Sequence, residues 1–285
     1  MKSSPSPSPS PSPERALDDA LLAATLACEA GALLRRLRSE NANAMLTNKA
    51  LGDAGDAQAN TFLIDALKRE RPLDAILSEE SADDFLRLNA ERVWIIDPLD
   101  GTREYREGRD DWAVHVALVS AGQVIAAAVA IPSRDEVCSS NDGKAAMESR
   151  ARIHANACPP DARQRALPAL LSPAATSTNI VVISRSRPPS FAQRVATALG
   201  ADLKPIGSAG AKAMMVVRGD ALAYVHDGGM NEWDAAAPVG VALAHGLHVC
   251  DLRGNAITFN HRDVVLREGL IICRAELTTT ILAAL

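Results

Sequence analysis

The chain has few aromatic residues, no long hydrophobic run and no excess of positive charge. Phe, Trp and Tyr make up 3% of its 285 residues, and no stretch reaches the roughly 18 consecutive apolar residues that a membrane span needs. Lysine and arginine total 30 against 35 for aspartate and glutamate, so the net charge of −5 offers no overall positive field to a nucleic acid polymer. We therefore expect a protein that binds neither a membrane nor DNA or RNA.

Closely spaced cysteines are also missing. There is no C-x-x-C pair and no neighbouring histidine at zinc-ligand spacing among the five cysteines, Cys28, Cys138, Cys158, Cys250 and Cys273. Isolated cysteines of this kind are typical of buried thiols in a reducing compartment. The N-terminus lacks the apolar segment of a signal peptide, so we expect a cytoplasmic location.

The sequence does contain enough hydrophobic residues for a substantial core. Hydrophobic residues make up 47% of the chain and charged residues 23%, which is typical of a globular protein. The length suits one large domain or two lobes. Residues 1–13 are an exception, because a Ser-Pro repeat cannot pack, and we expect a disordered tail there.

The first half of the chain predicts helices followed by strands. Leucines recur at helical spacing between Glu14 and Arg38, and a second helix is expected from Asp56 to Arg71. Short apolar runs then indicate strands at Ala75–Leu77, Val93–Ile96, Trp112–Val119 and Gln123–Ile131. This order predicts a helix layer packed on a sheet.

The second half of the chain has a different texture. Residues 132–179 lose the periodicity, and we expect an extended surface excursion with room for one strand. Strands and helices then alternate from Ile180 to the C-terminus, which indicates an α/β lobe. The sequence therefore divides into an N-terminal α+β lobe at 14–179 and a C-terminal α/β lobe at 180–285.

The segment WIIDPLDGT, residues 94–102, carries the densest chemical signal. An apolar strand runs into Asp97 and Asp100, and the intervening proline and the Asp-Gly pair favour a turn that brings both carboxylates together. The N–H groups of Gly101 and Thr102 are left free to hold an anion. Paired carboxylates suit Mg²⁺, which prefers oxygen ligands. The alternative is a strand followed by an ordinary Asp-Gly turn.

Two further acidic segments lie on either side of this one in the sequence. Glu79 and Glu80 follow a short predicted strand, although an isolated pair of this kind is more typical of a solvated loop. The segment EWDAAAP is typical of a helix start, with Asp234 as the N-cap and Pro238 in the first turn. For Asp234, a simple helix cap is the alternative.

Together the three segments resemble one family, the lithium-sensitive, Mg²⁺-dependent phosphatases that include inositol monophosphatase and the 3′(2′),5′-bisphosphate nucleotidases. DPLDGT and WDAAAP are similar to the two signature motifs of this family, and EES is similar to a third segment. The resemblance covers nearly all of residues 14–285, and DPLDGTREY with EWD is most similar to the CysQ-type nucleotidases. It implies an α/β fold, a layered α/β/α/β/α sandwich of the inositol monophosphatase/fructose-1,6-bisphosphatase type, with a metal-binding first lobe and a substrate-binding second lobe.

The resemblance also implies roles for individual residues. Two to three Mg²⁺ ions are expected, with ligands from Glu79, Asp97, Leu99 (its carbonyl), Asp100 and Asp234. The implied catalytic residues are Asp56, Thr102 and Glu79, and the N–H groups of Gly101 and Thr102 are expected to bind phosphate. For Asp56, an N-cap of the second helix is a compatible alternative.

Substrate-binding positions are implied in the same way. The nucleotidases embrace the nucleotide with a serine and a basic residue after a strand and with a lysine on a helix. The similar positions here are Ser186, Arg187, Ser208, Lys212 and His226. Arg187 stands where these enzymes often carry histidine, and His226 stands where they often carry arginine. Both are alternatively ordinary surface or strand-end residues.

The implied function is Mg²⁺-dependent hydrolysis of the 3′-phosphate of adenosine 3′,5′-bisphosphate to AMP and phosphate, with its sulfated precursor as a further substrate. The alternative is an inositol monophosphatase or a broad sugar-phosphate phosphatase, and a remote alternative is an inactive phosphometabolite binder. The partner is therefore expected to be a small phosphate ester, and a homodimer is expected because family members are often dimers. His115, on a predicted strand, is expected to be a bonded structural histidine.

Overall fold

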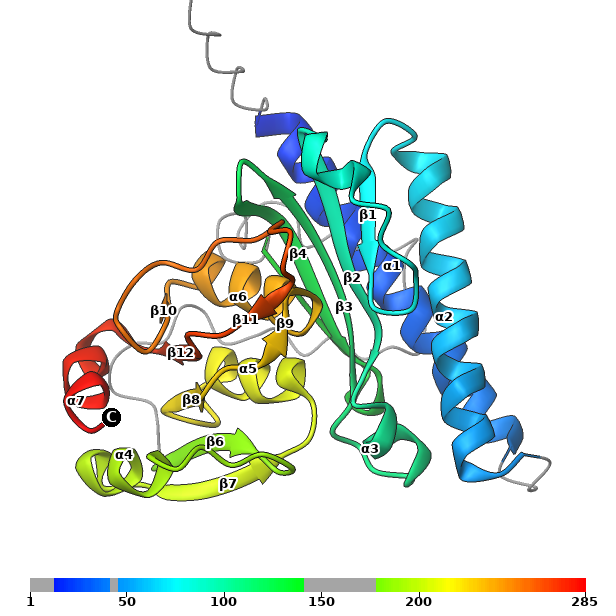
Figure 1. The fold of residues 1–285 in the computed structure, drawn as a ribbon. Helices are drawn as coiled ribbons and strands as arrows, with labels where there is room; N and C mark the ends of the chain where they lie inside the picture. Colours follow the sequence, from blue (N-terminus) through cyan, green and yellow to red (C-terminus); the bar gives the residue numbers. More distant parts are fainter. Residues whose placement is uncertain (1–12, 42–45, 141–177) are drawn as a thin grey trace, which may run out of the picture.

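The computed structural model describes residues 13–41, 46–140 and 178–285 (Figure 1). The Ser-Pro tail predicted at residues 1–13 lies outside the described residues, except for Pro13, where the first helix begins. Most of the excursion predicted at 132–179 lies outside them as well, except for its first residues, which form a 3-10 turn and a strand.

The first sheet is formed entirely by residues before 140, with the strand order β1-β2-β3-β4-β5. β1 (Ala75–Ser78) runs parallel to β2 (Arg92–Asp100), and the remaining neighbours are antiparallel. The other elements of this half are α1 (Pro13–Glu40), α2 (Asn48–Glu70), η2 (Leu86–Asn89), α3 (Thr102–Arg106), β3 (Ala113–Ser120), β4 (Gln123–Ile131), η3 (Pro132–Arg134) and β5 (Glu136–Ser139).

The second sheet is formed by residues after 178, with the strand order β10-β12-β8-β6-β7. Its strands are β6 (Ile180–Ser184), β7 (Asp202–Ile206), β8 (Ala223–His226), β10 (His248–Cys250) and β12 (Leu270–Cys273). β9 (Met230–Asn231) and β11 (Val265–Leu266) pair separately. The helices are α4 (Ala192–Leu199), α5 (Ala209–Arg218), α6 (Glu232–Ala244), η4 (Ala275–Leu277) and α7 (Thr278–Ala283).

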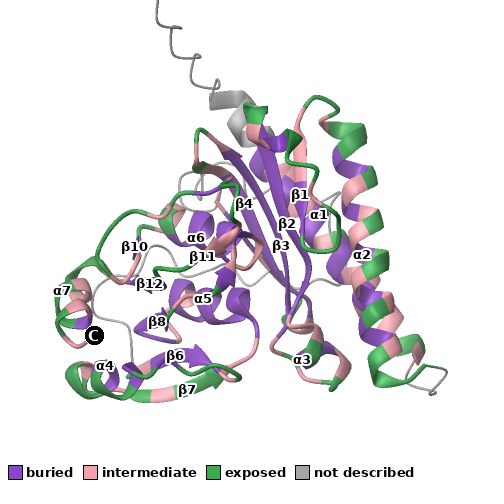
Figure 2. Cartoon of the chain, viewed as in Figure 1, coloured by how far each residue is buried: buried purple, intermediate pink, exposed green. Residues whose placement is uncertain are grey.

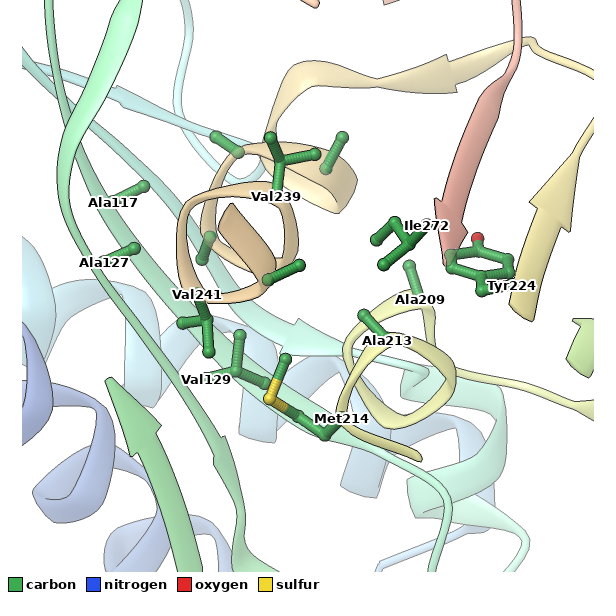
Figure 3. Packing of buried hydrophobic residues seen from close by; sticks show 14 of the residues in the cluster. Ala117, Ala127, Val129, Ala209, Ala213, Met214, Tyr224, Val239, Val241 and Ile272 are labelled. Atoms are coloured by element: carbon green, nitrogen blue, oxygen red, sulfur yellow. The ribbon is translucent and has the colours of Figure 1, made fainter. Parts of the chain in front are cut away.

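These elements stack in five layers (Figure 1). α1 and α2 cover one face of the first sheet, α5 and α6 lie between the two sheets, and α4 and α7 cover the outer face of the second sheet. Figure 3 shows the middle layer, where Met214 of α5 and Val239 of α6 lie between Ala127 of the first sheet and Ile272 of the second. The predicted α/β/α/β/α sandwich is confirmed.

Side-chain alternation decides which helices each face of the first sheet contacts. Trp94 and Ile96 of β2 pack with α1 and α2, whereas Val93 and Ile95 pack with α5 and α6. Every residue of β2 is buried (Figure 2), as expected for a strand covered on both faces. Because the period of a strand is two residues, Asp97 points toward the α5–α6 layer.

The two halves of the chain share one core. In the chain, the strands of the first sheet all precede residue 140 and those of the second sheet all follow residue 178. The largest hydrophobic cluster nevertheless combines Val93 and Val129 of the first sheet with Met214 and Tyr224 of the second half. The division into two lobes at this boundary stays a prediction.

The start of α2 differs from the prediction. The helix begins at Asn48, with Thr47 as its N-cap, so Asp56 lies inside the helix and the alternative of an N-cap there is wrong. Gly52 and Gly55 resemble loop residues in the sequence. In the structure a Cβ at Gly55 would lie 3.1 Å from Cδ2 of Leu99, so this glycine allows α2 to approach the first sheet closely.

The cysteines agree with the expectation in part. Cys138, Cys250 and Cys273 are buried thiols, but Cys28 is disulfide-bonded, so the expectation of a thiol at that position is wrong. Cys158 lies outside the described residues. None of the helices in the described ranges combines the length and the apolar character needed to cross a membrane.

Candidate active site

A bulge in β2 brings Asp97 and Asp100 to the same face of the first sheet. Asp97 pairs with His115 and Asp100 pairs with Ala113, so β2 has one more residue than β3 between these two pairs. The bulge contains Pro98, which has no N–H to donate to the ladder. Because one extra residue reverses the alternation, Asp100 faces the α5–α6 layer as Asp97 does.

The third carboxylate comes from the first turn of α6. Asn231 is the N-cap, and Oδ2 of Asp234 accepts the N–H of Asn231 at 2.7 Å in a capping box. The expectation that Asp234 is the N-cap is therefore wrong, and Pro238 lies in the helix interior, not in its first turn. Oxygens of Asp97, Asp100 and Asp234 lie within 4.8 Å of one another, so the two signature motifs converge on one point.

Glu79 approaches this group from the end of β1. Ser78 pairs with Ile96 in parallel register, so the next residue along each strand places Glu79 beside Asp97. Desolvation, followed by the charges of Asp234 and Asp100, raises the pKa of Glu79 to about 7. The structure thus brings all four predicted carboxylate ligands together, and we call them the acid cluster: Glu79, Asp97, Asp100 and Asp234.

The carboxylates of the acid cluster oppose one another's ionisation. Burial, followed by the charges of Glu79 and Asp100, raises the pKa of Asp97 well above its ordinary value. Burial and the charge of Asp100 raise the pKa of Asp234 to about 6. A hard divalent cation fits this donor set, because it removes the repulsion and prefers carboxylate oxygens.

Asp100 is held by three groups that all approach the same oxygen. The hydroxyl of Ser208 donates to Oδ2 at 2.5 Å, the N–H of Gly210 donates at 2.8 Å, and Nε2 of His115 lies 3.1 Å away. Burial would raise the pKa of Asp100, but His115 and Lys212 hold it below the ordinary value. Among the described residues no donor approaches Oδ1, so this oxygen is available to a metal ion.

His115 connects Asp100 to α6. Its Nδ1 lies 3.0 Å from the carbonyl oxygen of Trp233, the residue before Asp234, and its side chain is fully buried. Because a carbonyl oxygen only accepts, Nδ1 carries the proton. Burial would lower the pKa of His115, but the charge of Asp100 raises it above the ordinary value. The expectation of a bonded strand histidine is confirmed, and alternation along the strand places it on the same face as Asp97.

Thr102 and Asp56 meet where α3 packs against α2. Oγ1 of Thr102 lies 3.2 Å from Oδ1 of Asp56 and 3.1 Å from the carbonyl oxygen of Leu99. Desolvation, followed by the charge of Glu80, raises the pKa of Asp56 to about 7, which suits a proton acceptor near neutral pH. Gly101, at φ 89°, precedes the first turn of α3, where N–H groups lack intrahelical acceptors.

Ser186 and Arg187 lie in the loop that follows β6, and both are exposed. The backbone N–H of Arg187 donates to Oγ of Ser184 at 3.1 Å, and its guanidinium donates to the carbonyl of Gly229 at 3.2 Å. Arg187 therefore connects the loop after β6 with the loop after β8. The remaining guanidinium donors of Arg187 have no recorded partner among the described residues.

His226 ends β8 and is buried. Its Nδ1 accepts the N–H of Gly228 at 3.1 Å. Burial, followed by the charge of Lys212, lowers the pKa of His226 to about 4, so its ring is neutral near pH 7. A neutral imidazole cannot supply the positive charge that nucleotidases often place here as arginine.

The side chains of Ser208 and Lys212 bind the protein's own backbone. Ser208 is the N-cap of α5 and accepts the N–H of Ala211 at 2.9 Å, in addition to its bond to Asp100. Nζ of Lys212 lies 5.2 Å from the centre of the Tyr224 ring and donates to three backbone carbonyls, those of Ile206, Gly207 and Ser208. A substrate contact by either residue is therefore a prediction that these bonds do not support.

A buried network also supports the start of α6. Glu232 is fully buried, and its carboxylate accepts the N–H groups of Asn260 at 2.7 Å and His261 at 2.9 Å. Arg87, which is 1% exposed, donates to the side chain of Asn260 and to the carbonyl of His261. No pattern in the sequence predicts that Arg87 contacts residues so much later in the chain. Glu232 could be singled out only because it belongs to the EWD segment.

Solved structures share this fold along nearly its whole length. CysQ from Bacteroides thetaiotaomicron matches with a TM-score of 0.71 and 21% identity, covering 90% of this chain and 97% of that one. Inositol monophosphatase from Anabaena matches with a TM-score of 0.69 and 19% identity, covering 95% of each chain. At these identities the likeness establishes the fold.

The sequence profile of the inositol monophosphatase family matches residues 18–285. The chain belongs to this family, and the resemblance expected from its motifs is confirmed.

Several curated relatives of higher sequence identity are named as nucleotide phosphatases. The chain is 43% identical over 279 residues to a protein of Mycobacterium leprae named 3′-phosphoadenosine 5′-phosphate phosphatase, covering 94% of each chain. It is 44% identical over 263 residues to the protein of that name from Mycobacterium tuberculosis, covering 90% of this chain and 89% of the relative. It is 31% identical over 220 residues to the Escherichia coli 3′(2′),5′-bisphosphate nucleotidase CysQ, covering 76% of this chain and 82% of the relative.

Proposed function

We propose that this chain is a Mg²⁺-dependent phosphatase that hydrolyses the 3′-phosphate of adenosine 3′,5′-bisphosphate to AMP and phosphate. One observation carries the chemistry: oxygens of Asp97, Asp100 and Asp234 converge within 4.8 Å in a site that also contains the Thr102–Asp56 pair. The substrate is supported by 43% identity over 94% of the chain to a relative named for the same nucleotide.

The acid cluster and the carbonyl of Leu99 would hold two to three Mg²⁺ ions. Bound there, the ions supply Lewis acidity to the phosphate and a nucleophilic water at neutral pH. The carboxylates come from β1, β2 and α6, so the site depends on the packing of the middle helix layer against the first sheet.

The residues around the acid cluster have separate tasks. The hydroxyl of Thr102 orients the attacking water and donates its own proton toward Asp56, 3.2 Å away. Asp56, with a pKa of about 7, then takes up the proton that the reaction releases. The N–H groups of Gly101 and Thr102 bind the phosphate oxygens at the start of α3. Glu79, at the solvent-facing edge of the acid cluster, completes the implied catalytic set.

The nucleotide is proposed to lie over the loop after β6. Ser186 is exposed there, and Arg187 retains guanidinium donors for the 5′-phosphate. Because His226 is neutral, Arg187 supplies the charge at this side of the site. The sulfated precursor carries the same 3′-phosphate, with a sulfate attached to its 5′-phosphate, and is proposed as a further substrate.

A second candidate function is hydrolysis of inositol or sugar phosphates by the same acid cluster. The observation that favours it is the neutral, buried ring of His226, which removes a positive charge from the nucleotide side. The expected homodimer, the cytoplasmic location and inhibition by lithium stay predictions.

The test is phosphate release with Mg²⁺ from adenosine 3′,5′-bisphosphate, inositol 1-phosphate and fructose 1,6-bisphosphate, compared as kcat/KM. A strong preference for the nucleotide, with AMP as the second product, supports the proposal. Equal or greater activity on the inositol or sugar phosphate would overturn the proposed substrate and retain the metal chemistry.

A further inference from the structure

A pocket is lined by residues from the end of α1, the start of α2, and α3 with the residue that follows it by two positions. Figure 1 shows where these three helices lie in the fold. Its volume is about 520 Å³, which lies in the range of small-molecule sites. None of the acid cluster residues lines it. The lining residues are Arg35, Arg38, Ser39, Asn41, Leu51, Tyr105, Arg106 and Gly108.

Among the described residues that line the pocket there are three arginines and no carboxylate. The chain as a whole carries a net charge of −5, so the pocket is positively charged on a negatively charged protein. Serine and asparagine side chains add neutral hydrogen-bonding groups, and the buried Leu51 and Tyr105 form apolar surface. Such a lining favours an anion over a cation or a purely apolar ligand.

Arg38 is held in a fixed position in this pocket. Its guanidinium carbon lies 5.5 Å from the centre of the Tyr105 ring and 5.3 Å from that of Trp112, a cation–π arrangement. Nη1 donates to the carbonyl of Arg109 at 2.7 Å, and the nearest carboxylate, that of the exposed Asp110, is 3.8 Å from Nη2. Arg38 thus keeps most of its charge and several donors without further ordering.

Arg106 is the least compensated of the three. It is half-buried, and within the described ranges no hydrogen bond or ion pair is recorded for its guanidinium. Its charge acts on Asp56 from a longer distance, where it opposes part of the rise in the pKa of that carboxyl. Arg35, by comparison, is paired with Asp135. The aliphatic part of Arg106 packs where α2 and α3 touch, since a Cβ on Gly52 would lie 3.6 Å from its Cδ. A partly buried guanidinium without a hydrogen-bond partner gains free energy from binding an anion.

We propose that this pocket is a second anion site, which binds a small ligand through a phosphate or sulfate group. Planar guanidinium groups recognise the tetrahedral oxygens of both anions through paired N–H donors. The inference does not depend on the proposed substrate. Arg106 lies one helical turn after Thr102 on α3, so an anion in the pocket would contact the same short helix as the catalytic threonine.

The test measures anion binding to the full chain by calorimetry in EDTA. Without a metal ion the acid cluster repels anions, and the variants below assign the binding that remains to the pocket. Sulfate, phosphate and pyrophosphate are titrated separately against a chloride background of matched ionic strength, which removes general screening. The three arms distinguish a sulfate ligand from a phosphate ligand.

The matched variants are Arg106→Met and Arg103→Met, which make the same change on the same helix. Arg103 is exposed, pairs with Glu107 and does not line the pocket. We expect saturable binding of at least one anion, weakened about tenfold or more by Arg106→Met, as for loss of one charged hydrogen bond, and unchanged by Arg103→Met. Arg35→Met, which changes a lining residue on α1, is expected to weaken binding as well. Absence of saturable binding, or equal weakening by Arg103→Met and Arg106→Met, would overturn the proposal.

Discussion

Nε2 of His115 lies 3.1 Å from Oδ2 of Asp100, while Nδ1 of the same ring lies 3.0 Å from the carbonyl oxygen of Trp233. One buried side chain therefore fixes a carboxylate of the first sheet relative to the start of α6, which carries Asp234. The geometry of the proposed metal site thus depends on a residue that is not itself a predicted ligand.

Replacing His115 with Asn removes this connection, because the shorter side chain cannot reach both partners. We expect the Mg²⁺ concentration for half-maximal activity to rise about 10- to 100-fold, the usual effect of losing a residue that orients a metal ligand. The Mg²⁺ dependence of both the thermal midpoint and the activity measures this. Val119→Ala, on the same strand and the same face, controls for lost stability and should leave the Mg²⁺ dependence unchanged. A folded His115→Asn protein with normal Mg²⁺ dependence would refute the positioning role.

The stability of the metal-free protein should fall as pH rises. In the folded chain the pKa of Glu79 is about 7 and that of Asp234 about 6, whereas in the unfolded chain both groups ionise near their ordinary values. Between about pH 4 and pH 7 the folded state therefore holds more protons, and the free energy of unfolding decreases with increasing pH. Chemical denaturation in EDTA across this range measures the slope.

Saturating Mg²⁺ should remove most of this slope, because the ion replaces the protons as the partner of the carboxylates. The variant Asp97→Asn, which removes one repelling charge, should flatten the slope in EDTA. Identical pH profiles in EDTA and in Mg²⁺ would show that the acid cluster does not bind the ion.

Asp56 is expected to act on turnover rather than on binding. Asp56→Asn cannot take up a proton from Thr102, and kcat should fall about 100- to 10,000-fold, the usual contribution of a general base, with little change in KM. Steady-state kinetics on adenosine 3′,5′-bisphosphate measure both constants. Asp65→Asn, an exposed position on the same helix, should retain wild-type kinetics. A large rise in KM with unchanged kcat would argue against the proton-acceptor role.

Arg187 should discriminate between substrates. Arg187→Met removes a charged hydrogen bond to the 5′-phosphate, so kcat/KM for adenosine 3′,5′-bisphosphate should fall about tenfold or more. Inositol 1-phosphate lacks this group, and its kcat/KM should stay nearly constant. Lys212→Met provides the contrast: Lys212 supports the turn before α5, so both substrates should lose activity equally. Equal losses in Arg187→Met would contradict the placement of the nucleotide.

Local sequence signals predicted the fold and the carboxylates of the site well. The apolar run before Asp97 predicted the buried strand that carries Asp97 and Asp100. The turn expected between these two residues is wrong, because residues 97–100 continue β2 and a bulge there brings both carboxylates to one face. The alternation of strand and helix patterns in the second half of the sequence predicted the helices α5 and α6. Motifs of this kind can be recognised in a sequence because a few consecutive residues determine both their chemistry and their backbone geometry.

Features that depend on distant contacts could not be predicted in the same way. Gly55 looks like a loop residue until α2 is packed against Leu99, and the N-cap of α6 is Asn231 because Asp234 reaches back to its N–H. The bonds of Ser208 to Asp100 and of Lys212 to the preceding carbonyls likewise appear only after the second half folds onto the first.

Dependence of the hydrolysis on a metal ion in the acid cluster is tested most directly by phosphate release from adenosine 3′,5′-bisphosphate, measured for the wild type and for Asp100→Asn, each with Mg²⁺ and with EDTA. Asp100→Asn keeps the side-chain volume and removes a carboxylate of the acid cluster. We expect activity only for the wild type with Mg²⁺, and a circular dichroism spectrum of Asp100→Asn that matches the folded wild type. Activity that survives in EDTA or in Asp100→Asn would show that hydrolysis does not depend on a metal ion held by this cluster.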